Sequence, residues 1–160
     1  MDDQKNCKCP EIEDQDWHLK DLDWSGKFFY FEDLPHFFNV PLGLEKKQEE
    51  MKAQIVRKGY SIVNEDMILH EPGLFRGRLL LEIEDPEQYD ANVLQFENAR
   101  ILTRVHHGGS GGLKESLDEL KAFTQDRTHV LPGAIYYWHV TCPKCAKERG
   151  GDKMVLLARV

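Results

Sequence analysis

The feature that most constrains the fold is one order of elements that occurs twice along the chain. Each half begins with a strand and a loop marked by glycine or proline, continues with an amphipathic helix, and ends with two strands. The helices are expected between Pro41 and Gly59 and from Leu113 to Gln125, because their apolar residues recur at a spacing near 3.6. This duplicated strand–helix–strand–strand order predicts an α+β fold, with two main helices on one antiparallel sheet.

The expected strands are short runs of aromatic and aliphatic residues bounded by turn residues. They cover residues 17–24, 27–31, 67–70 and 76–83 in the first half, and 100–107, 134–140 and 154–160 in the second. Residues 1–15 are rich in acids and amides and are expected to form a loose N-terminal arm. The remaining residues, 16–160, are expected to form a single domain whose halves span about 16–90 and 91–160.

Charge and hydropathy narrow the range of partners. The formal net charge is −7, whereas proteins that bind nucleic acid gain affinity from clustered lysine and arginine, so nucleic acid is not expected as a partner. The longest apolar runs are too short to cross a bilayer, and the N-terminus lacks the pattern of a signal peptide. A cytoplasmic protein without a membrane partner is therefore expected.

The duplicated order resembles the GyrI-like (gyrase-inhibitor-like) domain, also known as a multidrug effector-binding domain. The resemblance rests on Trp17–Leu22 with Lys27–Phe31, on Ile101–Gly109, and on the aromatic strand Ile135–Trp138, and it spans roughly residues 16–160. It implies a pseudo-symmetric pair of halves with an aromatic-lined central cleft, in a bacterial domain that occurs alone or fused to transcription regulators. The favoured function is a stand-alone module that sequesters or senses bulky, planar aromatic, often cationic compounds. Some members of the family resemble hydrolases of cyclopropane-bearing compounds, so an enzyme acting in the same cleft is the alternative.

The resemblance also directs attention to particular residues. Many members carry a glutamate on the strand that here reads Tyr136-Tyr137-Trp138, and this chain has none there. Glu82 on the corresponding strand of the other half is the candidate replacement. In the enzyme alternative, Glu82 acts as an acid or base with Tyr137, because an acid in an apolar cleft can hold a raised pKa.

Aromatic residues supply the remaining ligand-binding candidates. Consecutive residues on a strand point to opposite faces, so the aromatic strand must place rings on both faces of the sheet. Flat rings bind planar molecules and attract cations. The expected ligand-binding residues are Tyr30, Phe37, Phe38, Glu82, Tyr136, Tyr137 and Trp138; the competing interpretation is that the rings fill the core and that Glu82 is a solvated strand acid.

Four cysteines form the sharpest local motif. Cys142 and Cys145 form a C-x-x-C pair, and Cys7 and Cys9 could complete a four-sulfur zinc site. Thiols without a metal in a loop are the favoured interpretation, and the zinc site comes second. Redox chemistry is a distant third, because the segment after Cys145 is too short for a stable helix. No other cofactor is expected. A zinc-stabilised interaction protein is thus a third functional hypothesis.

Adjacent histidines precede a glycine-rich run in the second half. His106 and His107 lie on an expected strand and must point to opposite faces, so they are not expected to bind one metal ion. The run Gly108–Gly112 leads into a helix and could hold an anion with its backbone amides. A flexible strand–helix connection is the favoured interpretation, since the run lacks the Lys-Ser/Thr ending of a P-loop.

Overall fold

The duplicated order of elements is present in the structure, a computed structural model that describes residues 9–38, 40–148 and 150–160. The elements of the first half are α1 (Asp14–Trp17), β1 (Asp21–Asp23), β2 (Phe28–Phe37), β3 (Val40–Pro41), α2 (Leu44–Arg57), β4 (Ile68–Glu71) and β5 (Arg76–Ile83). The remaining elements are β6 (Val93–Gln95), β7 (Arg100–His107), α3 (Leu113–Thr128), β8 (Ala134–His139), α4 (Pro143–Glu148) and β9 (Lys153–Arg159).

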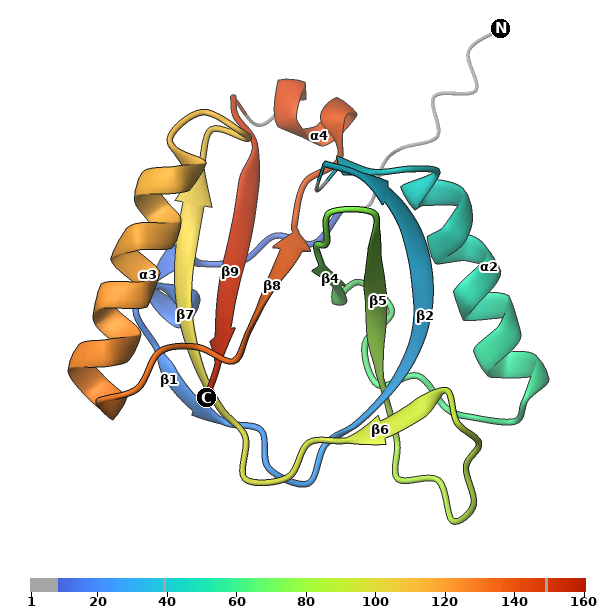
Figure 1. The fold of residues 1–160 in the computed structure, drawn as a ribbon. Coiled ribbons are helices and arrows are strands. Elements are labelled where there is room, and N and C mark those ends of the chain that lie inside the picture. Colours follow the sequence, from blue (N-terminus) through green and yellow to red (C-terminus); the bar gives the residue numbers. More distant parts are fainter. Residues whose placement is uncertain (1–8, 39, 149) are drawn as a thin grey trace, which may run out of the picture.

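One antiparallel sheet of nine strands carries the described part of the chain. Its order is β1-β7-β9-β8-β4-β5-β2-β3, and β6 also pairs with β2. The two halves join where β4 pairs with β8, with Leu69 opposite Trp138 and His70 opposite Tyr137. Figure 1 shows the sheet curving strongly, with α3 outside β7 and β9 and α2 outside β2. The expected α+β fold with two main helices on one antiparallel sheet is therefore confirmed.

Alternation along the strands explains the layers. Leu79, Leu81 and Ile83 point toward α2 and pack with Met51 and Ile55. In the second half, Leu102, Leu156 and Ala158 pack with Leu120 of α3, in a second core that also includes Tyr137. Strand residues whose side chains point to the other face of the sheet, such as Phe29, Leu80 and Trp138, form a third core on the inner face of the curved sheet. Each half therefore has its own helix-covered core, and the inner core spans both.

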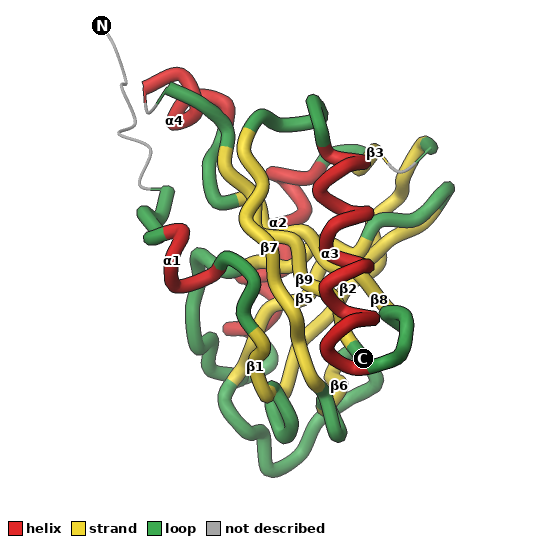
Figure 2. Tube along the Cα trace, turned by 90° about the vertical axis from the view of Figure 1, so that its left-hand side faces the viewer, coloured by secondary structure: helices red, strands yellow, loops and turns green. Residues whose placement is uncertain are grey.

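The chain before β1 covers part of the second half. Residues 9–20, called the arm below, run beside β7, as the side view in Figure 2 shows for α1. The oxygen of Trp17 accepts a hydrogen bond from the Thr103 hydroxyl of β7, and the Trp17 ring meets the Trp138 ring edge to face at 5.1 Å between centroids. Contacts to strand and core thus fix this segment in place.

Three local expectations were wrong. Residues 17–24 do not form one strand, because the backbone turns through α1 and only Asp21–Asp23 pairs with β7. The strand β6 was missed; it is only three residues long and lies beside a polar connector. The segment after Cys145 was expected to be too short for a stable helix, but its first three residues complete a six-residue helix, α4, that begins at Pro143. No helix in the described residues is both long enough and apolar enough to cross a bilayer.

Candidate functional site

Most of the aromatic side chains predicted to bind a ligand lie in the cores. Tyr30 is 1% exposed, Tyr136 is 2% exposed and Trp138 is 3% exposed. The indole N–H of Trp138 donates a hydrogen bond to the Asp66 carbonyl oxygen at 3.0 Å, which satisfies its one polar group. The cavities described below are lined by other residues. The rings of these three residues therefore stabilise the fold.

Glu82 and Tyr137 are not brought together. Tyr137 lies opposite His70, which lies opposite Leu79, so Tyr137 shares the helix-covered face with Leu79. Glu82 is three residues from Leu79 and points to the other face, where Lys27 pairs with it at 3.1 Å. Burial raises the pKa of the Tyr137 hydroxyl. The two residues cannot act on one substrate from opposite faces of the sheet.

Phe37 and Phe38 lie at an exposed tip of the fold. They are 60% and 59% exposed, and their rings meet edge to face at 4.6 Å. Phe75, on the turn that enters β5, lies 6.1 Å from Phe38. Neither residue lines one of the cavities described here.

A cavity of about 640 Å³ opens at the junction of the two halves, and we call it the seam pocket. Apolar side chains of Leu44, Ile68 and Val140 form part of its wall, and Cys9 and Pro10 of the arm form another part. Its charged residues come from both halves: Glu45, Glu49, Lys52, Glu65, Asp66 and Asp152. The lining thus contains five acidic residues and one lysine, which makes the pocket acidic.

His139 also lines the seam pocket and ends a row of three histidines. The Nε2 atoms of His36 and His70 are 2.6 Å apart, and His139 Nε2 lies 3.5 Å from His70 Nδ1. The rings of His36 and His70 stack at 4.9 Å, and those of His70 and His139 at 5.7 Å. We call these three residues the histidine row.

The hydrogen bond between His36 and a backbone carbonyl group sets the positions of the hydrogens along the histidine row. His36 Nδ1 lies 2.7 Å from the Leu34 carbonyl oxygen, which can only accept, so this nitrogen carries a hydrogen. With neutral rings, His36 Nε2 then accepts from His70 Nε2, and His70 Nδ1 accepts from His139 Nε2. Burial, with the neighbouring His139 and His36, lowers the pKa of His70 to about 3, and burial also lowers the pKa of His139. His139 Nδ1 is therefore left with a lone pair.

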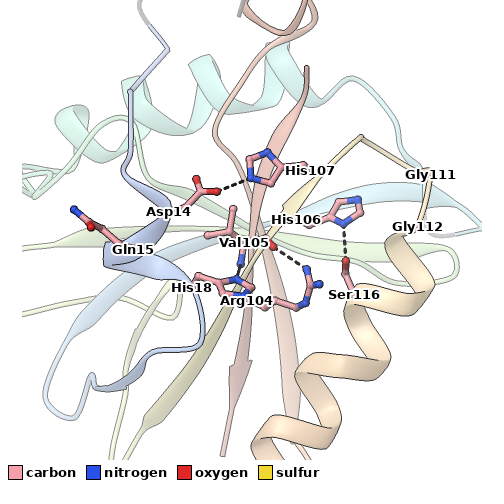
Figure 3. Close-up of a pocket in the computed structure, with 10 residues that line it drawn as sticks. All are labelled: Asp14, Gln15, His18, Arg104, Val105, His106, His107, Gly111, Gly112 and Ser116. Carbon is pink, nitrogen blue, oxygen red and sulfur yellow. Dashed lines mark hydrogen bonds and ion pairs between the residues drawn. The ribbon is translucent and has the colours of Figure 1, made fainter. Parts of the chain in front are cut away.

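A second cavity, of about 520 Å³, lies between the arm, β7 and the start of α3 (Figure 3). His106 Nε2 donates to the Gly109 oxygen at 2.7 Å, so its Nδ1 accepts from the Ser116 hydroxyl at 2.7 Å. His107 points the other way and pairs with Asp14 at 2.6 Å. The two histidines thus lie on opposite faces, and His106 connects the glycine-rich loop to α3.

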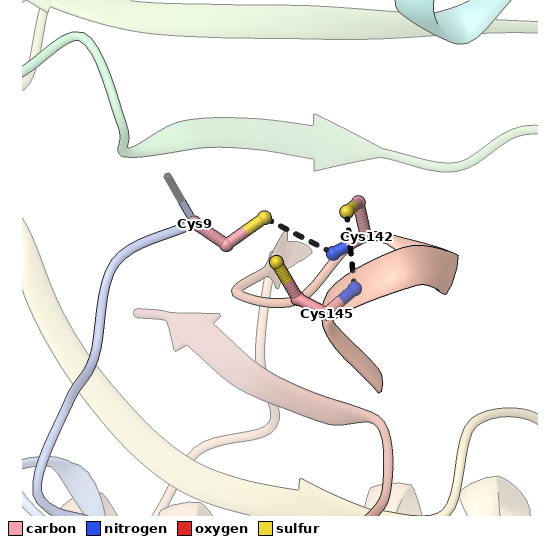
Figure 4. Close-up of side chains that lie close together, drawn as sticks. All are labelled: Cys9, Cys142 and Cys145. Carbon is pink, nitrogen blue, oxygen red and sulfur yellow. Dashed lines mark hydrogen bonds between the residues drawn. The ribbon is translucent and has the colours of Figure 1, made fainter. Parts of the chain in front are cut away.

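Three cysteines meet where the arm approaches α4 (Figure 4). The sulfur atoms of Cys9, Cys142 and Cys145 all lie within 4.8 Å of one another and could hold a metal ion. Cys7, the fourth cysteine of the predicted site, lies outside the described residues. We call the three described residues the thiol cluster.

Comparison with known proteins names a family. The family model described as "Bacterial hydrolase" matches residues 1–160. The chain belongs to the bacterial hydrolase family. No curated protein matches the chain. The family name differs from the GyrI-like domain that the sequence resembles, and it agrees in part with the hydrolase alternative.

Among solved structures, this bacterial hydrolase family member is similar to the C-terminal domain of EcmrR. The TM-score is 0.58 with 12% sequence identity, and the match covers 88% of this chain and 93% of that domain. At this identity the likeness shows the fold alone.

The histidine row and the acidic lining of the seam pocket were missed by sequence reasoning. His70 is 34 residues from His36 and 69 from His139, so no local motif joins them. The register of β5 against β2 and β4, and of β4 against β8, brings them together. Only a correct pairing of the strands could have revealed this row.

Proposed function

We propose that the protein binds a cationic small molecule in the seam pocket. The observation that carries this proposal is the charge of the pocket lining. Five acidic residues and a single lysine surround a cavity between the two halves. A cation entering such a cavity gains attraction from several carboxylates, while an anion of the same size is repelled.

The size and walls of the pocket suit an organic cation. Small-molecule sites commonly measure roughly 300–1,000 Å³ and combine apolar walls with a few polar groups. The seam pocket measures about 640 Å³, and Leu44, Ile68 and Val140 give it apolar surface. The aromatic rings expected to line the cleft are replaced here by aliphatic side chains and carboxylates.

Binding can be tested with two ions of matched shape, tetraphenylphosphonium and tetraphenylborate, by isothermal titration calorimetry. We expect the cation to bind and the anion not to bind. The double variant Glu45→Gln/Glu49→Gln should weaken cation binding by about two- to thirtyfold, since exposed charge interactions contribute about 0.2–1 kcal/mol each. Glu50→Gln is the matched control, because Glu50 lies on the same helix and pairs with Lys46 instead of lining the pocket. Equal binding of both ions would exclude the proposal.

Hydrolysis in the same pocket is the second candidate function, favoured by membership of the bacterial hydrolase family. His139 lines the pocket, and a histidine with a lowered pKa is neutral near pH 7 and can accept a proton. Its Nδ1 would take a proton from a water molecule that attacks an ester or similar bond. The proton would then pass to the leaving oxygen, giving an acid and an alcohol.

This second candidate is tested with a nitrophenyl ester that carries a quaternary ammonium group, compared with neutral 4-nitrophenyl acetate. We expect faster release of nitrophenol from the cationic ester. His139→Gln should abolish that release while tetraphenylphosphonium still binds. His107→Gln is the control, because His107 lies outside the seam pocket. Unchanged turnover in His139→Gln would refute the role of this base.

A further inference from the structure

We infer that Cys9, Cys142 and Cys145 are ligands of one zinc ion that fastens the arm to the second half of the fold. The three sulfur atoms lie within 4.8 Å of one another, although 133 residues separate Cys9 from Cys142. Sulfur atoms bound to one tetrahedral zinc ion lie roughly 3.8 Å apart, given a Zn–S distance of about 2.3 Å. Small side-chain rotations would therefore bring all three into coordination.

Backbone amides already point at two of these sulfur atoms. The Cys142 N–H donates to Cys9 Sγ at 3.3 Å, and the Cys145 N–H donates to Cys142 Sγ at 3.5 Å. Hydrogen bonds to sulfur favour the thiolate, which is the form that binds a metal. Such bonds also orient a ligand toward its ion. The amides therefore prepare two of the three sulfur atoms for coordination.

The composition of the thiol cluster favours zinc over harder cations. Thiolates select zinc, copper(I) or iron–sulfur clusters, whereas magnesium and calcium prefer oxygen ligands. Cys145 is 2% exposed, so its sulfur is shielded from solvent. A disulfide would join only two of the three sulfur atoms, whereas one tetrahedral ion uses all three.

The position of Cys9 gives the ion a specific role. Beyond it, the arm is held by Lys153, whose ammonium group donates to the Ile12 oxygen at 3.1 Å and pairs with Asp14 at 2.8 Å. Zinc bound to Cys9 adds an attachment at the N-terminal end of the described arm. It also fixes the Cys9–Pro10 wall of the seam pocket.

The first test measures metal in protein produced with added zinc and purified under reducing conditions without chelator. We expect about one zinc ion per chain in the wild type and at least a fivefold lower content in Cys142→Ser and Cys145→Ser. Lys153→Met is the matched control, because it removes arm contacts but no sulfur, and it should keep its zinc. Less than about one zinc ion per ten chains, another metal, or equal zinc in the cysteine variants would overturn the inference.

A second test needs no variant, so it holds even if the cysteine variants fail to fold. Wild-type protein is stripped with a chelator and reconstituted with cobalt(II). Tetrahedral thiolate coordination predicts intense visible bands together with sulfur-to-cobalt charge transfer. Removal of zinc should also lower the melting temperature by about 5 °C or more and speed proteolysis within residues 9–20. Weak octahedral cobalt bands and an unchanged melting temperature would refute the site.

Discussion

The Nε2 atoms of His36 and His70 are 2.6 Å apart on the helix-covered face of the sheet, so one hydrogen must lie between them. Both side chains are buried, at 4% and 2% exposed. Two charged rings cannot occupy this contact, because each would present an N–H to the other. The contact therefore needs one ring nitrogen that donates and one that accepts.

Acid should destabilise the fold through His70. Its pKa is about 3 in the folded protein and 6.5 in the unfolded chain, so between these values the unfolded chain binds more protons. Stability from this residue is thus present above about pH 6.5 and is lost as the pH falls toward 3. From about pH 7.5 to pH 5 the loss should be about 2 kcal/mol.

Urea unfolding of the wild type and of His70→Gln at these two pH values measures this contribution. The variant should be less stable at both values but should show a smaller difference between them. The neighbouring His36, His139 and Tyr137 remain in the variant, so the comparison isolates His70. An identical pH dependence in both proteins would contradict the assignment.

Gly77→Ala should destabilise the protein because a side chain at this position has no room. A Cβ atom here would lie 2.4 Å from the Glu71 carbonyl oxygen and 2.4 Å from His36 Cε1. Relief requires displacement of β4 backbone or of the His36 ring, so we expect a loss of at least about 2 kcal/mol. Gly133→Ala is the control, because its Cβ would meet only the Arg159 oxygen at 3.9 Å. Similar unfolding midpoints for both variants in urea would contradict this expectation, because they would show that the His36 ring and the β4 backbone move at little cost in free energy.

The fold was accessible from sequence because it rests on local periodicity. The spacing of apolar residues located α2 and α3, and short apolar runs bounded by turn residues located β5 and β7. Periodicity says little about a stretch such as residues 17–24, where tertiary contacts to Thr103 and Trp138 decide the conformation.

The site was less accessible because it depends on register and on packing between distant segments. The aromatic strand was correctly expected to place rings on both faces, yet the sequence does not show what covers each face. Trp17 and Leu69 cover Trp138. The predicted proximity of the cysteines is confirmed for three of the four, since Cys9 lies close to Cys142 and Cys145.

Trp138→Phe should lower stability without impairing cation binding. It removes the indole N–H bond to the Asp66 oxygen and some buried volume, which should cost about 1–2 kcal/mol. Trp138→Ala should cost about 3–5 kcal/mol because it also leaves a cavity. Folded Trp138→Phe should bind tetraphenylphosphonium within about twofold of the wild type, since the ring does not line the seam pocket. Loss of binding in this folded variant would place Trp138 at the ligand.

The attachment of the arm to the second half should depend more on the packing of Trp17 than on the ion pairs of Asp14. Lys153 and His107 lower the pKa of Asp14, but the Asp14 side chain is 46% exposed, so Asp14→Asn should cost less than about 1 kcal/mol. That small contribution is present above the unfolded pKa of 3.8 and disappears as the pH falls through the lower folded value. Trp17→Ala removes a half-buried ring from the edge of Trp138 and should cost about 2–3 kcal/mol. Limited proteolysis should then cleave residues 9–20 faster in Trp17→Ala than in Asp14→Asn. The reverse order would mean that charge, and not aromatic packing, holds the arm on the second half.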